Sequence, residues 1–105
     1  MQAIAREMLI CQDDSERERF TEWFFGLDMV TRGRVQAHID RVEDGNFKHV
    51  EPVGGGVSEL KMDFGPGYRV YFGQKSKEVH LICGGIKNGQ QADIDFAKEF
   101  WSKHE

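Results

Sequence analysis

The stretch "GVSELKMDFGPGYRVYF", residues 56–72, decides the fold because apolar and polar side chains alternate on both sides of a glycine and proline turn. A period of two residues is typical of half-buried antiparallel strands. The stretch therefore predicts a β-hairpin that turns at "GPG", residues 65–67. The expected buried face carries Leu60, Met62, Phe64, Tyr68, Val70 and Phe72, and the opposite face carries Lys61, Arg69 and Tyr71.

Two more elements are predicted after the hairpin. "VHLICGG", residues 79–85, predicts the third strand of an antiparallel meander. "ADIDFAKEFWSKHE", residues 92–105, predicts a C-terminal helix that lies across the sheet. The apolar side of that helix carries Ile94, Ala97, Phe100 and Trp101.

The segment before the hairpin predicts a pair of helices. In "SERERFTEWFFGL", residues 15–27, four large apolar residues repeat with a helical period, and Ser15 with Glu18 has the form of a capping box. A second helix is expected from an N-cap at Asp28 to Glu43. The four apolar residues of the first helix are Phe20, Trp23, Phe24 and Leu27.

Two further segments complete the chain. Residues 5–11 are a candidate first strand, whereas Pro52 and the three glycines at 54–56 predict a loop over residues 47–56. The order of elements predicts one α+β domain over residues 1–105, with an N-terminal helical hairpin packed on a small antiparallel sheet and a C-terminal helix. A chain of 105 residues that is 39% hydrophobic and contains eight Phe can bury one core.

Localisation and cofactors are predicted from what the sequence contains. Cys11 and Cys83 match no metal-ligand or CxxC spacing, and His49 and His80 have no partner at such a spacing, so we expect reduced thiols, no metal and no cofactor. No signal peptide or transmembrane stretch is recognisable, which predicts a cytoplasmic protein with no membrane partner.

The charge of the chain is unevenly distributed. The formal net charge is −4, which by itself argues against nucleic-acid binding. Seven acidic and two basic residues lie between Glu7 and Asp28, so the rest of the chain carries +1. The sequence therefore still allows a locally basic face outside the acidic segment.

The polar face of the predicted hairpin is the first candidate site. Lys61, Arg69 and Tyr71 share that face, and Lys87 follows the third strand on a glycine-flanked loop. Two cations and an aromatic ring suit a phosphate chain with an unpaired base. The alternative is purely structural, because Lys61 lies between Glu59 and Asp63 and such charges can pair across strands.

A second basic row lies on the second predicted helix. Arg34, His38 and Arg41 repeat at helical spacing beside its apolar stripe. The simpler interpretation is a solvated face balanced by Asp40 and Glu43. Contact with an RNA backbone is the alternative.

Residues 20–101 resemble the phage Gp49-like, addiction-module killer (HigB-like) family of the RelE/ParE toxin superfamily. The likeness rests on "GVSELKMDFGPGYRVYF" followed by "GGIKNGQQADIDFA" and, before them, on "DMVTRGRVQAHIDRVEDGNF". It implies a small toxin fold and a type II toxin–antitoxin module in which a helix-turn-helix antitoxin neutralises the toxin. It also implies an endoribonuclease that cleaves mRNA on the ribosome without a metal.

The resemblance also implies roles for residues. Arg69 would bind the scissile phosphate, Lys61 would assist it or act as base, Lys87 would be a second phosphate contact, and Tyr71 would stack on a base. No general acid is evident, because "ADID" stands near the start of the last helix where some relatives carry Tyr or His. Two alternatives therefore stay open, which are a binding protein that keeps the fold and the antitoxin but does not cleave, and a ParE-like gyrase inhibitor. The oligomeric state is not predicted.

Overall fold

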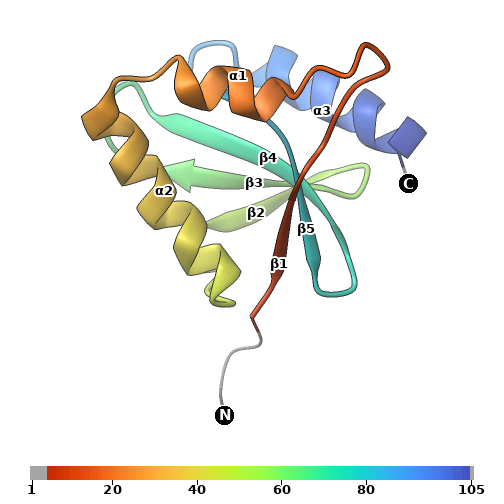
Figure 1. Ribbon diagram of the computed structural model, residues 1–105, viewed down its shortest axis with the longest axis horizontal. Coiled ribbons are helices and arrows are strands. Elements are labelled where there is room, and N and C mark those ends of the chain that lie inside the picture. Colours follow the sequence, from red (N-terminus) through yellow and green to blue (C-terminus); the bar gives the residue numbers. More distant parts are fainter. Residues whose placement is uncertain (1–4, 105) are drawn as a thin grey trace.

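The predicted hairpin forms the middle of a five-stranded sheet (Figure 1). The computed structural model describes residues 5–104. β3 (Val57–Met62) and β4 (Tyr68–Lys75) pair antiparallel, and β5 (Glu78–Ile86) continues the meander as predicted. β1 (Glu7–Ile10) adds to β5 in parallel, so the sheet is mixed and has the order β1-β5-β4-β3-β2.

The turn between β3 and β4 depends on its glycines. Gly65 has φ 56° and Gly67 has φ 81°, a region in which a side chain is strained. The Gly67 N–H donates to the carbonyl of Phe64 at 3.0 Å, which closes the turn. The ring of Tyr68 folds back over Gly65, where a Cβ atom would lie 3.0 Å from it.

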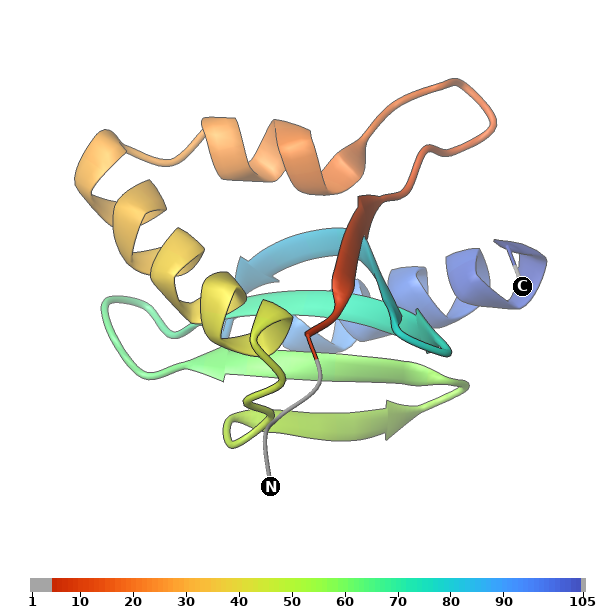
Figure 2. The same ribbon diagram turned by 60° about the horizontal axis from the view of Figure 1, so that its bottom comes forward.

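Helices cover both faces of the sheet. α1 (Arg19–Phe25) and α2 (Met29–Glu43) form the predicted helical pair on one face, and α3 (Gln90–His104) lies on the other (Figures 1 and 2). Within residues 5–104, no helix is long and apolar enough to span a membrane. The α1/α2 core contains Phe20, Val35, Ile39, Val42, Leu60, Met62, Val70, Phe72, Val79 and Leu81. The α3 core contains Cys11, Val57, Tyr71, Ile82, Cys83, Ala97 and Trp101.

The start of α2 is confirmed and the start of α1 is not. Asp28 caps α2, where its carboxylate accepts the Thr31 N–H at 2.8 Å, and this bond lowers the pKa of Asp28. The expected capping box at Ser15 is wrong, because the N–H of Ser15 donates to the carboxylate of Asp13 in a turn before the helix. α1 begins at Arg19, and its N-cap, Glu18, makes no side-chain capping bond.

The expected loop over residues 47–56 is also wrong. β2 (Val50–Gly54) pairs antiparallel with β3 at the edge of the sheet. An edge strand accommodates Pro52, because one side of its backbone needs no ladder partner. Gly54, Gly55 and Gly56 all have positive φ and make the tight return into β3.

Candidate functional site

Three predicted cations lie at the turn end of the sheet. Lys61 and Arg69 are Cα partners in neighbouring strands, and Arg69 is the Cα partner of Gly85 in β5. Lys87 follows β5 directly, and a Cβ atom built on Gly67 would lie 3.2 Å from both Arg69 Nη1 and Lys87 Cβ. The structure therefore brings Lys61, Arg69 and Lys87 together, although they come from three separate segments.

The three cations differ in accessibility. Lys87 is exposed and Lys61 is half-buried, whereas Arg69 is only 4% exposed. Arg69 Nη1 donates to the carbonyls of Gly67 at 3.0 Å and Tyr68 at 3.3 Å, which braces the turn. The expectation that Arg69 lies on an open face is wrong, because α3 covers this face of the sheet.

Glu59 is the centre of a buried polar network beneath these cations. Its Oε2 accepts the Tyr71 hydroxyl at 2.9 Å and the Gln90 side-chain amide at 2.6 Å. Arg69 Nε lies 3.9 Å from the same oxygen and, among the described residues, has no hydrogen-bond partner. Burial of a carboxyl group that is only 2% exposed is costly unless such partners satisfy its oxygens.

Tyr71 cannot act as predicted. Its side chain is fully buried, so it cannot stack on a base in this conformation. Burial, together with the hydrogen bond to Glu59, raises the pKa of the phenol well above its ordinary value. Tyr71 is therefore a fixed donor to Glu59.

Asp93, in the first turn of α3, adds a carboxyl group to the same region. Its carboxylate lies directly over Gly85, where any Cβ atom would collide with it. Burial raises the pKa of Asp93 above its ordinary value of 3.8. A carboxyl with a raised pKa beside clustered cations is a candidate proton donor.

The two arginines predicted on α2 are separated from each other. Arg34 lies over the ring of Phe64, 3.9 Å from its centroid, so it flanks the β3–β4 turn from the α2 side. Arg41 is exposed and lies in the last turn of α2, about 10 Å further along the helix axis. Arg34 thus lies beside the β3–β4 turn on the α2 side of the sheet, and Arg41 lies away from the turn.

Glu59, Gln90 and Asp93 were not predicted as site residues. Glu59 and Lys61 are two residues apart in a strand, so the sequence places them on the same face of the sheet. Gln90 and Asp93 are about one helical turn apart, so the sequence also places them on the same side of α3. The sequence pattern could not predict that α3 packs on the polar side of the hairpin.

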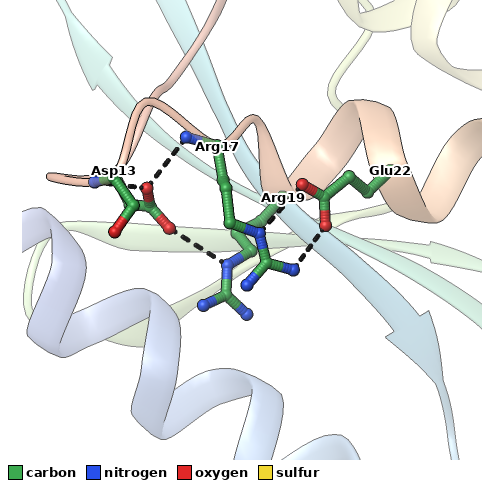
Figure 3. Close-up of polar contacts among 5 residues, drawn as sticks. Asp13, Arg17, Arg19 and Glu22 are labelled. Atoms are coloured by element: carbon green, nitrogen blue, oxygen red, sulfur yellow. Dashed lines mark hydrogen bonds and ion pairs between the residues drawn. The ribbon is translucent and has the colours of Figure 1, made fainter.

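A separate hollow of about 330 Å³ lies between the β1–α1 loop and α3. Figure 3 shows how this loop is held: Asp13 accepts the Arg17 N–H at 2.9 Å and Arg19 Nε at 3.2 Å, and Arg17 pairs with Glu22 at 2.6 Å. The hydrogen bond from the backbone N–H of Arg17 is the main cause of the lowered pKa of Asp13. None of the predicted site residues lines this hollow, whose walls are Gln12, Asp13, Asp14, Ser15, Arg19, Phe96, Glu99, Phe100, Lys103 and His104.

Comparison with known proteins identifies a relative. No protein-family model matches the chain, and no solved structure matches it. A protein of Haemophilus influenzae, described as "Uncharacterized protein", is 40% identical over 81 residues, which is 75% of this chain and 82% of the relative. This degree of identity over most of both chains shows that the chain belongs to the same family as the Haemophilus influenzae protein.

Proposed function

We propose that this chain is the toxin of a type II toxin–antitoxin module in the RelE/ParE superfamily and cleaves mRNA in association with the ribosome. The observation that carries the proposal is the convergence of Lys61, Arg69 and Lys87 at the turn end of the sheet. The resemblance of residues 20–101 to the addiction-module killer family supports it. The small α+β fold, with a helical pair against the sheet, is compatible with that superfamily.

The chemistry requires three groups. Attack of an RNA 2′-hydroxyl on the adjacent phosphate needs a base, a cation near the phosphate oxygens and an acid for the leaving 5′ oxygen. Lys87 and Lys61 are accessible enough to contact a phosphate, and Lys61 is also the candidate base. Asp93 is the candidate acid, because its carboxyl group lies over Gly85, the Cα partner of Arg69, and burial raises its pKa.

Arg69 has a different role in this proposal from the one the sequence suggested. Its guanidinium is held by two turn carbonyls and lies near Glu59, so it acts as a positioning residue that fixes the turn beneath the phosphate. Its positive charge still contributes to the local field, because burial weakens solvent screening.

Expression without the antitoxin tests the proposal. Induction of the wild-type chain in a bacterium should arrest growth and produce cleaved mRNA, and Lys61→Ala/Lys87→Ala should abolish both. Lys77→Ala is the matched control, since Lys77 is an exposed lysine in the β4–β5 turn at the other end of β5. Normal growth and intact mRNA with folded wild-type protein would rule out the nuclease.

A protein that binds the antitoxin without cleaving RNA is the second candidate. It is favoured by the burial of Arg69 and Tyr71 and by three apolar side chains exposed where α1 meets α2: Phe25 at 65%, Met29 at 77% and Val30 at 76%. Co-purification with the product of an adjacent helix-turn-helix gene, combined with no RNA cleavage in ribosome extracts, would select this function.

A further inference from the structure

The fold brings a cysteine and two histidines together at the end of the sheet opposite the cation cluster. Cys11 directly follows β1, His80 lies near the start of β5, and His104 is the last residue of α3. The thiol sulfur and one nitrogen of each imidazole all lie within 4.8 Å of one another. The sequence did not predict this group, because its members are far apart in the chain.

We propose that Cys11, His80 and His104 form a binding site for a borderline-soft divalent metal ion such as Zn²⁺. Thiolate sulfur and imidazole nitrogen are both ligands that Zn²⁺ accepts, and three protein ligands leave a fourth position open. Carboxylate-preferring ions such as Mg²⁺ and Ca²⁺ do not suit these donors.

The neighbours of His80 support this assignment. Glu78 Oε1 lies 3.0 Å from His80 Nε2, so a metal that leaves this contact intact would bind His80 through Nδ1. Metal-bound histidines are commonly oriented in this way by a carboxylate on the second nitrogen. The side chain of His80 is only 12% exposed, which limits competition from water.

The backbone holds two of the ligands in register. The N–H of Cys11 donates to the carbonyl of Leu81 at 3.0 Å, and His80 is the Cα partner of Leu9 in the parallel β1–β5 ladder. Cys11 and His80 therefore lie on a rigid ladder, and His104 approaches from α3. A metal would join the first strand, the central sheet and the last helix.

Aromatic and charged neighbours define the surroundings. The Trp101 ring lies 5.4 Å from the His80 ring and 5.3 Å from the His104 ring, centroid to centroid. Lys75 Nζ lies 3.5 Å from the His104 carbonyl and 5.2 Å from the Trp101 ring. Lys75 opposes a cation, whereas Glu78 favours one. Cys11 is a buried thiol and would release its proton on binding the metal.

Titration with Co²⁺ and Zn²⁺ tests the site in the full chain without a polyhistidine tag. Co²⁺ should give a thiolate-to-cobalt charge-transfer band and tetrahedral d–d bands, and equimolar Zn²⁺ should remove them. Cys11→Ser should lose the charge-transfer band, and His80→Ala or His104→Ala should weaken binding at least about tenfold. Zn²⁺ should also raise the Tm of the wild type.

Matched variants make the test decisive. Cys83→Ser removes the other buried thiol and His49→Ala removes an exposed histidine outside the cluster, so both should keep the bands. His104→Ala changes an exposed residue at a helix end and should stay folded, which covers the case that Cys11→Ser unfolds. Absence of a charge-transfer band in the wild type, or its persistence in folded Cys11→Ser, would overturn the proposal.

Discussion

At the scale of single residues, buried polar groups define the centre of this protein. Glu59 and Arg69 are 2% and 4% exposed, yet the alternation of residues 56–72 assigned them to a solvent-facing surface. The alternation correctly located the core residues Leu60, Met62, Val70 and Phe72. The alternation could not show whether the polar face contacts water or is covered by a helix. Here α3 covers it, and the buried polar groups hydrogen-bond to one another.

Replacement of Arg69 should therefore destabilise the fold. Arg69→Met leaves Glu59 without its buried cation, and the expected loss is about 3–5 kcal/mol of unfolding free energy. Urea denaturation measures it, with Lys87→Met as the exposed control at the same end of the sheet. Adding Glu59→Gln to Arg69→Met should recover part of the loss, and strict additivity would contradict coupling of the pair.

Tyr71 should contribute through its hydroxyl alone. Tyr71→Phe keeps the ring but removes a donor to Glu59, which should cost about 1–3 kcal/mol. Tyr68→Phe is the control, since Tyr68 is only half-buried and packs on the opposite core. A denaturant titration measures the free energy of unfolding of both variants. Equal losses would show that the hydrogen bond from Tyr71 to Glu59 does not stabilise the fold.

At the scale of helices and strands, glycines determine how closely the layers approach. The Trp23 ring of α1 lies against Gly84 of β5, where a Cβ atom would overlap the ring. Gly33 in α2 has no neighbour within 4 Å of an added Cβ, apart from the adjoining residues of its own helix. The two glycines should respond oppositely to the same substitution.

Gly84→Ala should destabilise the protein by about 1–3 kcal/mol, because Trp23 must move away from β5. Gly33→Ala should stabilise it by about 0.5–1 kcal/mol, because alanine is the better helix former at an exposed position. Thermal unfolding followed by circular dichroism compares them. A stabilising Gly84→Ala would show that the Trp23 ring does not pack directly against Gly84.

Asp93, in the first turn of α3, should affect stability and the proposed RNA cleavage in opposite directions. Burial raises the pKa of Asp93 in the folded chain, so ionisation opposes folding. The contribution of Asp93 to stability should therefore fall as the pH rises from the ordinary carboxyl pKa of 3.8 through the raised value. Asp93→Asn should therefore match the wild type in acid and exceed it at neutral pH.

The same variant tests the proposed acid. If Asp93 protonates the leaving oxygen, Asp93→Asn should be more stable at neutral pH but lose growth arrest and RNA cleavage. Asp95→Asn, at an exposed position two residues along α3, is the control for both measurements. Full cleavage by Asp93→Asn would remove Asp93 from the mechanism.

Element prediction from the sequence succeeded where the signal was local. The N-cap at Asp28 and the hairpin glycines act within a few residues, and both are confirmed. β2 was missed because Pro52 and three glycines resemble a loop, whereas an edge position and a tight return accommodate them. β1 as a parallel partner of β5 was not predictable, because nothing near residues 7–10 specifies a strand so distant in sequence.

At the scale of the whole molecule, each face of one sheet has its own core, and the two candidate sites lie at opposite ends of β5. Lys87 follows its last residue and His80 lies near its first. Both sites also require α3, whose first turns provide Gln90 and Asp93 and whose last residue is His104. A chain that ends before residue 90 should therefore lose both sites together with the α3 core.

The parallel pairing of Glu7 with Glu78 has a consequence for synthesis. β1 leaves the ribosome well before β5, which is its only strand partner in the described chain. A nascent chain that lacks β5 thus has an unpaired β1 and an incomplete sheet. The residues of the two candidate sites, at either end of β5, remain apart in such a chain. If the proposed toxin activity is correct, the fold itself delays that activity until β5 and α3 have been synthesised, which protects the ribosome that makes them.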